Sequence, residues 1–154
     1  MSTIEESIEV EVPVSTAYNQ WTQFETFPEF MEGVDRIQQV DDTTTHWVTS
    51  IGGVTREFDA KITEQHPDER VAWRSVDAPH QAGVVTFHRL GDNLTRVMLQ
   101  IEYDPHGFVE NVGDALGFVT RRVEGDLKRF KEFIESRGQE TGAWRGEVRQ
   151  THTS

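Results

Sequence analysis

The residues of this sequence that could carry chemistry are histidines, arginines and aromatics, because cysteine is absent. Six histidines are present. No two of them stand three or four apart on an expected helix and no HExxH motif occurs, so the spacing of a metal site is missing. Serine occurs in no GxSxG motif and glycine in no phosphate-binding loop. We therefore expect no catalytic residue of these kinds, no metal site and no cofactor.

The aromatic side chains are the clearest chemical signal. Bulky apolar walls with few polar groups are typical of a cavity for an apolar or aromatic small molecule, although a single aromatic is more often plain core. Arginine on an expected strand could hold a ligand carbonyl, enol or carboxylate, although a surface ion pair is its commoner role. Alternation places Arg56 on the face of Phe58, and Arg74 on the face opposite to Trp73. The candidate cavity residues are Trp21, Phe27, Phe30, Met31, Trp47, Arg56, Phe58, Trp73, Arg74, Phe87, His88, Tyr103, Val112, Leu116, Phe118 and Val119.

Composition sets the class of protein. The 154 residues correspond to one ordinary domain. Fifteen Lys and Arg against 27 Asp and Glu give a net charge of −12, which repels nucleic acid. No run approaches the roughly 20 apolar residues of a membrane helix, and the first residues resemble no targeting segment. We expect a soluble, cytoplasmic protein with a small-molecule partner, no nucleic-acid partner and no integral membrane segment; a homodimer is left open.

Hydrophobic periodicity predicts the order of the elements. Alternating valine and isoleucine over 8–12 predict a first strand, followed by a short helix over 15–24, capped by Ser15, and a helical turn over 27–31. The period later changes to 3.6 and predicts a long amphipathic helix over 108–137, ended by Gly138. Turn residues separate six further strands, expected at 34–41, 45–51, 55–65, 70–76, 83–90 and 95–103.

This order predicts an α+β helix-grip fold. About seven strands with short connections form a curved antiparallel sheet around the long C-terminal helix, with two short helices after the first strand. A twisted sheet curled around one helix leaves room for a cavity between them. The domain is expected to span residues 1–138, and residues 139–154, which lack periodicity, are expected to form a flexible polar tail. Trp144 in this tail is left open as a docking residue or as one without a structural role.

The sequence resembles the START-like (Bet v 1-like, SRPBCC) helix-grip superfamily, near its polyketide cyclase/dehydrase and coenzyme-Q-binding branch. The resemblance covers roughly residues 4–137. Three segments carry it, and they read IEVEVPVSTAYNQWTQFETFPEFMEGV, REFDAKITEQHPDERVAWRS and VEGDLKRFKEFIESRG. It implies a bacterial-type protein that encloses a hydrophobic ligand.

Three functions remain as alternatives. The first is binding or carrying of a lipid, quinone or polyketide-like molecule without catalysis, and the second is an aromatic polyketide cyclase/dehydrase (aromatase). The aromatase branch implies a pocket arginine before the proline that ends the fourth strand and a tyrosine after the FPEF-like segment. This sequence has Gln65 and His66 before Pro67, and Val34 near the second position, so both depart from that pattern. We therefore lean away from an enzyme. The third alternative, a protein-interaction module, rests on Trp144 alone.

Overall fold

The computed structural model describes residues 2–51, 53–77, 80–104 and 115–149, with the backbone alone for residues 2, 115, 116 and 118. The helix predicted over 108–137 is described from its residue 115 onward. The elements in chain order are β1 (Ser2–Val10), α1 (Val14–Trp21), the 3-10 helix η1 (Phe24–Glu29), β2 (Val34–Asp41), β3 (Thr44–Ile51), β4 (Val54–His66), β5 (Arg70–Ser75), β6 (Gln81–Gly91), β7 (Leu94–Tyr103) and α3 (Ala115–Arg137).

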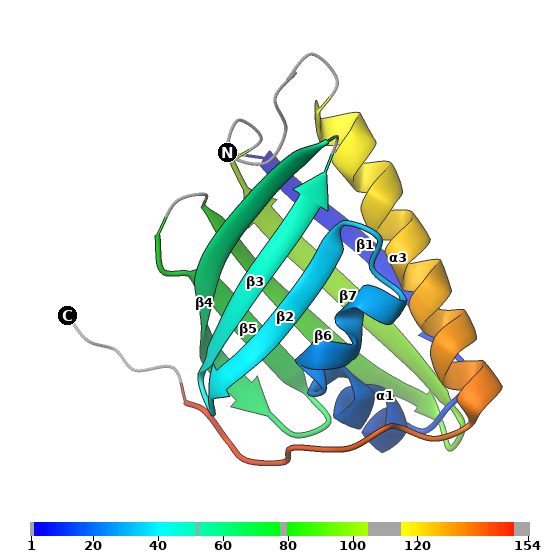
Figure 1. Cartoon of the computed structure of the whole chain (residues 1–154). Helices are drawn as coiled ribbons and strands as arrows, with labels where there is room; N and C mark the ends of the chain where they lie inside the picture. The colour runs from blue at the N-terminus through cyan, green and yellow to red at the C-terminus, as the bar shows by residue number, and fades with distance from the viewer. Residues whose placement is uncertain (1, 52, 78–79, 105–114, 150–154) are drawn as a thin grey trace.

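The seven strands form one antiparallel sheet in the order β1-β7-β6-β5-β4-β3-β2. β1 pairs with β7 along its whole length, from Ser2 opposite Tyr103 to Val10 opposite Thr95. Figure 1 shows the sheet curving and α3 running along its concave side, with α1 and η1 at one end. The predicted helix-grip fold is confirmed.

The core lies between the concave face of the sheet and α3. On β4, Phe58, Ala60 and Ile62 alternate inward and are buried, as period-two patterning requires. On α3, side chains at helical spacing are buried against them, including Leu127, and Phe130 is fully enclosed. Gly138 adopts a φ of 75°, a conformation that suits glycine, and ends α3 as predicted.

The early helices differ in detail from the prediction. α1 begins at Val14 behind Pro13, and no side chain caps its first turn, so the predicted role of Ser15 is wrong. Proline fixes its own φ near the helical value, which suits it to the start of a helix. α1 ends at Trp21, and the Thr22 hydroxyl donates back to the Asn19 carbonyl at 2.6 Å. Buried apolar residues continue into η1 at a similar spacing. The sequence pattern therefore predicts a helix that extends past Trp21, where α1 ends.

Residues 139–149 lie on the body of the domain. Gln20 and Thr141 form two hydrogen bonds: the Thr141 backbone N–H donates to the side-chain Oε1 of Gln20 at 2.8 Å, and the side-chain Nε2 of Gln20 donates to the Thr141 hydroxyl at 3.1 Å. The Trp144 N–H donates to the Thr22 hydroxyl at 3.1 Å. Figure 1 shows this segment passing beneath α1 toward the end of β4. The flexibility of the tail stays a prediction, but the described contacts favour a docked segment.

The docked segment ends on an open edge of β4. Pairing between β3 and β4 stops at Lys61, so the last residues of β4 extend past β3. There Gln65 and Val148 exchange two backbone hydrogen bonds of 2.7 and 2.8 Å. Covering an exposed strand edge in this way satisfies its backbone groups.

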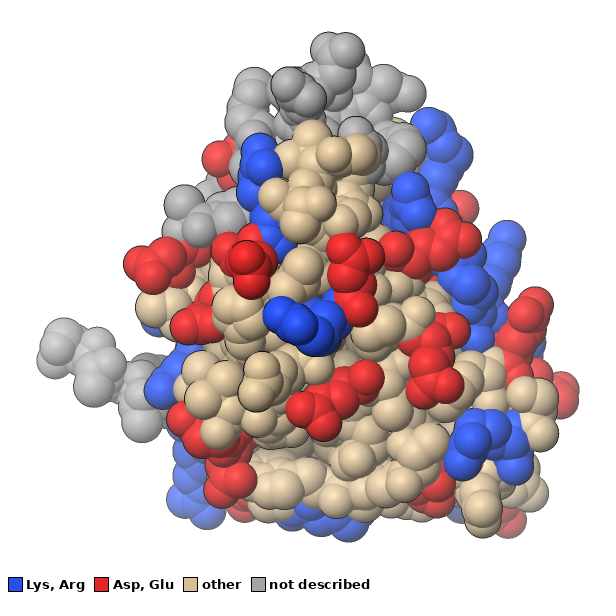
Figure 2. Space-filling view, in the orientation of Figure 1, with Lys and Arg blue, Asp and Glu red and all other residues tan. Residues whose placement is uncertain are grey.

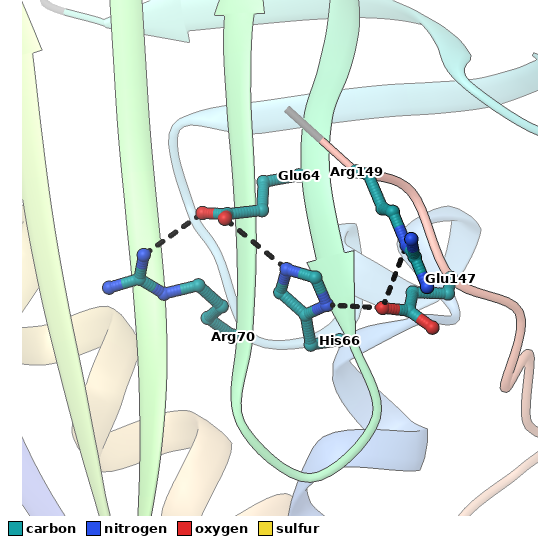
Figure 3. Close-up of polar contacts among 5 residues, drawn as sticks. All are labelled: Glu64, His66, Arg70, Glu147 and Arg149. Atoms are coloured by element: carbon teal, nitrogen blue, oxygen red, sulfur yellow. Dashed lines mark hydrogen bonds and ion pairs between the residues drawn. The ribbon is translucent and has the colours of Figure 1, made fainter. Parts of the chain in front are cut away.

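A chain of ion pairs accompanies this bridge. Figure 3 shows it running from Arg70 through Glu64 and His66 to Glu147 and Arg149. Both ring nitrogens of His66 face carboxylates, at 3.2 Å from Glu64 and 3.1 Å from Glu147.

In the described part of the chain, no helix has the length and apolar character that crossing a membrane would require.

Candidate functional site

A cavity of about 90 Å³ lies between α3 and the concave face of the sheet. Several elements contribute to its wall: α1, η1, the loop before β2, five of the strands and α3. The lining residues are Trp21, Phe27, Met31, Gly33, Val34, Trp47, Thr49, Ile51, Trp73, Gln81, Leu99, Ile101, Tyr103, Val119, Arg122, Val123, Asp126 and Leu127.

Stacked aromatic rings form the sheet side of the cavity. The rings of Trp73 and Trp47 lie 6.3 Å apart with planes 21° from parallel, and Trp47 and Phe58 lie 5.8 Å apart at 14°. Gly83 stands directly opposite Trp73 on β6, and a Cβ there would overlap the indole ring. The missing side chain therefore lets Trp73 lie flat on the sheet. The wall that results is aromatic and apolar.

Edge-to-face aromatic contacts close the end of the cavity at α1 and η1. The Trp21 ring lies 5.3 Å from Phe27 and 5.0 Å from Phe130, at steep angles. Such contacts are worth about 0.5–1.5 kcal/mol each beyond the burial of area. This end of the cavity is thus a packed aromatic cluster that joins α1, η1 and α3.

Four polar atoms of the wall are buried without a hydrogen-bond partner among the described residues: Trp21 Nε1, Trp73 Nε1, Thr49 Oγ1 and Gln81 Oε1. Trp47 differs, because its Nε1 donates to the Thr45 hydroxyl at 2.7 Å. Buried polar groups are normally paired with protein or water, and an unpaired one is costly. The wall is therefore apolar with a few unsatisfied polar positions, as in many ligand sites.

A charged cluster on α3 borders the cavity. Asp126 accepts hydrogen bonds from the Arg129 guanidinium and, at 3.2 Å, from the backbone N–H of Glu32. Arg122 donates to the Glu32 carboxylate at 2.6 Å. Burial raises the pKa of the Asp126 carboxyl from 3.8 to about 6, and the bonds from Arg129 and Glu32 lower it only in part. Asp126 can therefore exchange a proton near neutral pH.

Within the described residues, no cluster of His, Asp or Glu suited to a metal ion occurs.

Comparison with known proteins identifies the family of the chain. The model of the family described as polyketide cyclase/dehydrase and lipid transport matches residues 10–132. The chain belongs to this family. It is also 68% identical, over 96% of its length and 99% of the relative, to an uncharacterized 17.2 kDa protein in the melC2-rnhH intergenic region of Streptomyces lincolnensis.

Solved structures with low sequence identity share the fold. The Zhui aromatase/cyclase from Streptomyces sp. R1128 has a TM-score of 0.74 at 13% identity, with 93% of this chain and 99% of that chain covered. A START superfamily protein from Mycobacterium smegmatis has a TM-score of 0.68 at 12% identity, with 88% and 95% covered. These likenesses show that this member of the polyketide cyclase/dehydrase family has the same fold as those two proteins.

Among the residues that the structure describes, seven of the sixteen candidates line the cavity of this polyketide cyclase/dehydrase family member. They are Trp21, Phe27, Met31, Trp47, Trp73, Tyr103 and Val119. Phe30, Phe58 and Phe87 are buried in the adjoining core but do not line it. Val112 and the side chains of Leu116 and Phe118 lie outside what the structure describes. That the lining residues bind a ligand stays a prediction.

The three polar candidates do not reach the cavity. Arg74 and His88 are exposed, on the outer face of the sheet, because their neighbours Trp73 and Phe87 point inward. Arg56 shares the inward register of Phe58, as alternation predicts, but is half-exposed and donates to the Thr55 carbonyl at 3.1 Å. It is not among the lining residues.

The polar residues that do line the cavity escaped the sequence analysis. Asp126 stands between the stripe residues Val123 and Leu127, and a carboxylate in that position was the one available signal. Thr49 and Gln81 lie on strands, and nothing about a threonine or a glutamine there indicates that the side chain lines a cavity. Of the two positions where the aromatase pattern differs, Val34 lines the cavity and Gln65 is buried outside its lining.

Proposed function

We propose that this protein binds and carries a hydrophobic small molecule in the cavity between the sheet and α3, without transforming it. The observation that carries the proposal is the wall itself, which is built from stacked and edge-packed aromatic rings and aliphatic side chains of α3. Burial of a ligand there contributes roughly 25 cal/mol per Å² of apolar surface removed from water. Family membership supports hydrophobic ligand binding and cyclase activity alike.

The first experiment identifies what the protein retains. Native mass spectrometry of gently purified protein is followed by extraction and identification of any bound small molecule. A hydrophobic compound bound one to one supports the proposal. Binding is then measured by tryptophan fluorescence, because Trp21, Trp47 and Trp73 all line the cavity.

A blocking variant tests whether the ligand occupies this cavity. Val123→Phe places a larger ring in the wall, whereas Val40→Phe makes the same change at a side chain that is 60% exposed. We expect Val123→Phe to lose ligand binding and Val40→Phe to keep it, with both variants folded by circular dichroism. Equal binding by the two variants would place the ligand elsewhere.

A second candidate function is aromatic polyketide cyclase/dehydrase, and Asp126 is the observation that favours it. A carboxyl with a pKa of about 6 in a cavity wall can donate and accept a proton during aldol closure and dehydration. The test is turnover of a poly-β-ketone model substrate by wild type and by Asp126→Asn. Turnover that Asp126→Asn abolishes while ligand binding is retained would replace the carrier proposal with the enzyme.

Location and partners complete the proposal. We place the protein in the cytoplasm, with a small molecule as its partner. Figure 2 shows acidic and basic side chains interspersed on the face in view, and the net charge of −12 disfavours nucleic acid. The homodimer stays a prediction, which sedimentation equilibrium checks.

A further inference from the structure

Three hydrogen-bond donors in the cavity wall have no acceptor in the described protein. They belong to Trp21, Trp73 and Thr49, whose side chains are each more than nine-tenths buried. A donor that is shielded from water and left unpaired destabilises the fold, so such groups are normally satisfied. The third cavity tryptophan, Trp47, has its indole N–H satisfied by Thr45. The unsatisfied donors therefore point to acceptor oxygens on the occupant.

The charges beside the cavity disfavour an anionic occupant. Arg122 is engaged by Glu32 at 2.6 Å, and Arg129 is engaged by Asp126 and, at 3.3 Å, by Glu32. The two arginines thus have carboxylate partners already. Asp126 lines the cavity and repels a second carboxylate once it is ionised, above about pH 6. A carboxylate ligand would have to break one of these pairs to gain a cation.

The shape and volume of the cavity set the size of the occupant. A volume of about 90 Å³ is well below the roughly 300–1,000 Å³ of sites that enclose drug-sized molecules, whereas benzene occupies an engineered cavity of about 150 Å³. Trp73 and Trp47, whose ring planes are 21° from parallel, line the cavity and offer aromatic faces against which one ring can lie. The enclosed part of a ligand is thus at most one ring, which is too little space for a fused polycycle.

We propose that the cavity takes an uncharged single-ring compound that carries carbonyl oxygens, of the aryl ketone or simple quinone class, and rejects carboxylates and long acyl chains. The ring lies against the cavity tryptophans, and its oxygen accepts from the unpartnered donor of Trp73 or of Thr49. This inference rests on the proposed function, because it names the chemical class of the same ligand.

The experiment compares four probes by isothermal titration calorimetry at pH 7.5. Acetophenone has the ring and the carbonyl, ethylbenzene has the ring alone, benzoate has the ring with a charge, and laurate has an acyl chain with a charge. We expect acetophenone to bind about fivefold to tenfold more tightly than ethylbenzene, since one satisfied buried donor is worth about that factor. Benzoate and laurate should bind more weakly than either neutral ring.

Two conservative variants assign the preference to the donors. Thr49→Val removes the hydroxyl while keeping the shape, and Trp73→Phe removes the indole N–H. We expect at least one of the two to reduce the preference for acetophenone over ethylbenzene toward one, with ethylbenzene affinity changed less than twofold for Thr49→Val. Trp144→Phe, which changes an indole outside the cavity lining, should keep the full preference.

The outcomes separate this inference from the proposed function. Equal affinity for acetophenone and ethylbenzene, or tightest binding of laurate, would overturn the inference and leave a hydrophobic carrier in place. An undiminished preference in both Thr49→Val and Trp73→Phe would also overturn it. If Val123→Phe leaves the binding of every probe unchanged, the cavity is not the binding site and the proposed function fails.

Discussion

Two regions of this molecule hold buried polar groups that differ in their pairing: the Gln20 amide beneath the docked segment, and three donors in the cavity wall. Under the docked segment 139–149, the fully buried Gln20 amide is paired at both ends with Thr141, and its nitrogen also donates to Thr26 at 3.0 Å. In the cavity, Trp73 and Thr49 keep donors without a described partner. Polar groups paired within the chain contribute to the stability of the fold, whereas unpaired groups in a cavity wall are available to a ligand. Changes in the first region should therefore alter stability, and changes in the second should alter binding.

The largest effect is expected where the cavity wall and the core coincide. Leu127→Asp buries an unpaired charge beside Asp126, in a site that is 2% exposed, and should lower the free energy of unfolding by about 3–5 kcal/mol. Lys128→Asp introduces the same carboxylate at the next position, which is exposed, and serves as the control. Urea denaturation measures both. Similar urea midpoints for the two variants would contradict the assignment of the α3 stripe.

Removal of the docked segment is expected to have the next largest effect. A chain that ends after Gly138 leaves the Gln20 amide without Thr141 and uncovers the β4 edge at Gln65. The loss of both Gln20–Thr141 bonds and of the backbone pairs should cost about 2–3 kcal/mol, which lowers Tm by roughly 5–10 °C for a chain of this size. Differential scanning calorimetry measures the change. A Tm within 2 °C of wild type would support the flexible tail that the sequence predicts.

A second variant shows whether the amide itself matters. Gln20→Leu should destabilise the full chain by about 1 kcal/mol, because Thr141 loses its partners. In the shortened chain the same change should cost less, since the amide has already lost both bonds to Thr141 there and keeps only its bond to Thr26. Equal effects in both chains would mean that the Gln20–Thr141 pair contributes nothing.

The contrast also explains which features could be predicted from sequence. The apolar residues of the cavity wall can be predicted from hydrophobic periodicity and residue type. Trp47, Trp73 and Val119 of the α3 stripe are examples. Asp126 was missed because its partner Glu32 lies 94 residues away in sequence, and such pairing leaves no local pattern. Arg74 and His88 were included for their chemistry, although strand alternation directs them to the outer face.

The docked segment shows more clearly which features cannot be predicted from the sequence. Its attachment uses backbone hydrogen bonds and side-chain amides, such as the pair of Gln20 and Thr141 across 121 residues. These contacts need no apolar periodicity, so the sequence of the segment predicts an unstructured tail. Half-buried residues alternate with exposed ones along 141–149, but glycine and charged residues hide that period in the sequence.

The pH dependence of stability tests the cavity side of the comparison. The pKa of Asp126 is about 6 in the folded protein and 3.8 ordinarily, so folding favours its protonated form. The stability that this group contributes is fully present below pH 3.8 and is lost as the pH rises through about 6. Asp126→Asn should therefore be more stable than wild type at pH 8 by about 1–2 kcal/mol, with the difference vanishing near pH 4. Urea midpoints measured across this range check the sign. A variant less stable than wild type at pH 8 would mean that the bonds to Arg129 and Glu32 outweigh burial.

The smallest effect is expected for the exposed ion pairs that border the docked segment. Glu147→Gln removes the charge that faces His66 at 3.1 Å, but the Glu147 side chain is 48% exposed and solvent screens the pair. Exposed ion pairs are worth about 0–1 kcal/mol, so the change should move Tm by at most about 2–3 °C. The backbone bridge between Gln65 and Val148 persists in this variant because it involves no side chain. Scanning calorimetry at low and high salt completes the test, since an ion-pair contribution shrinks as salt rises. A loss as large as that of the shortened chain would show that the His66 pair, rather than the amide and backbone bonds, holds the segment on the domain.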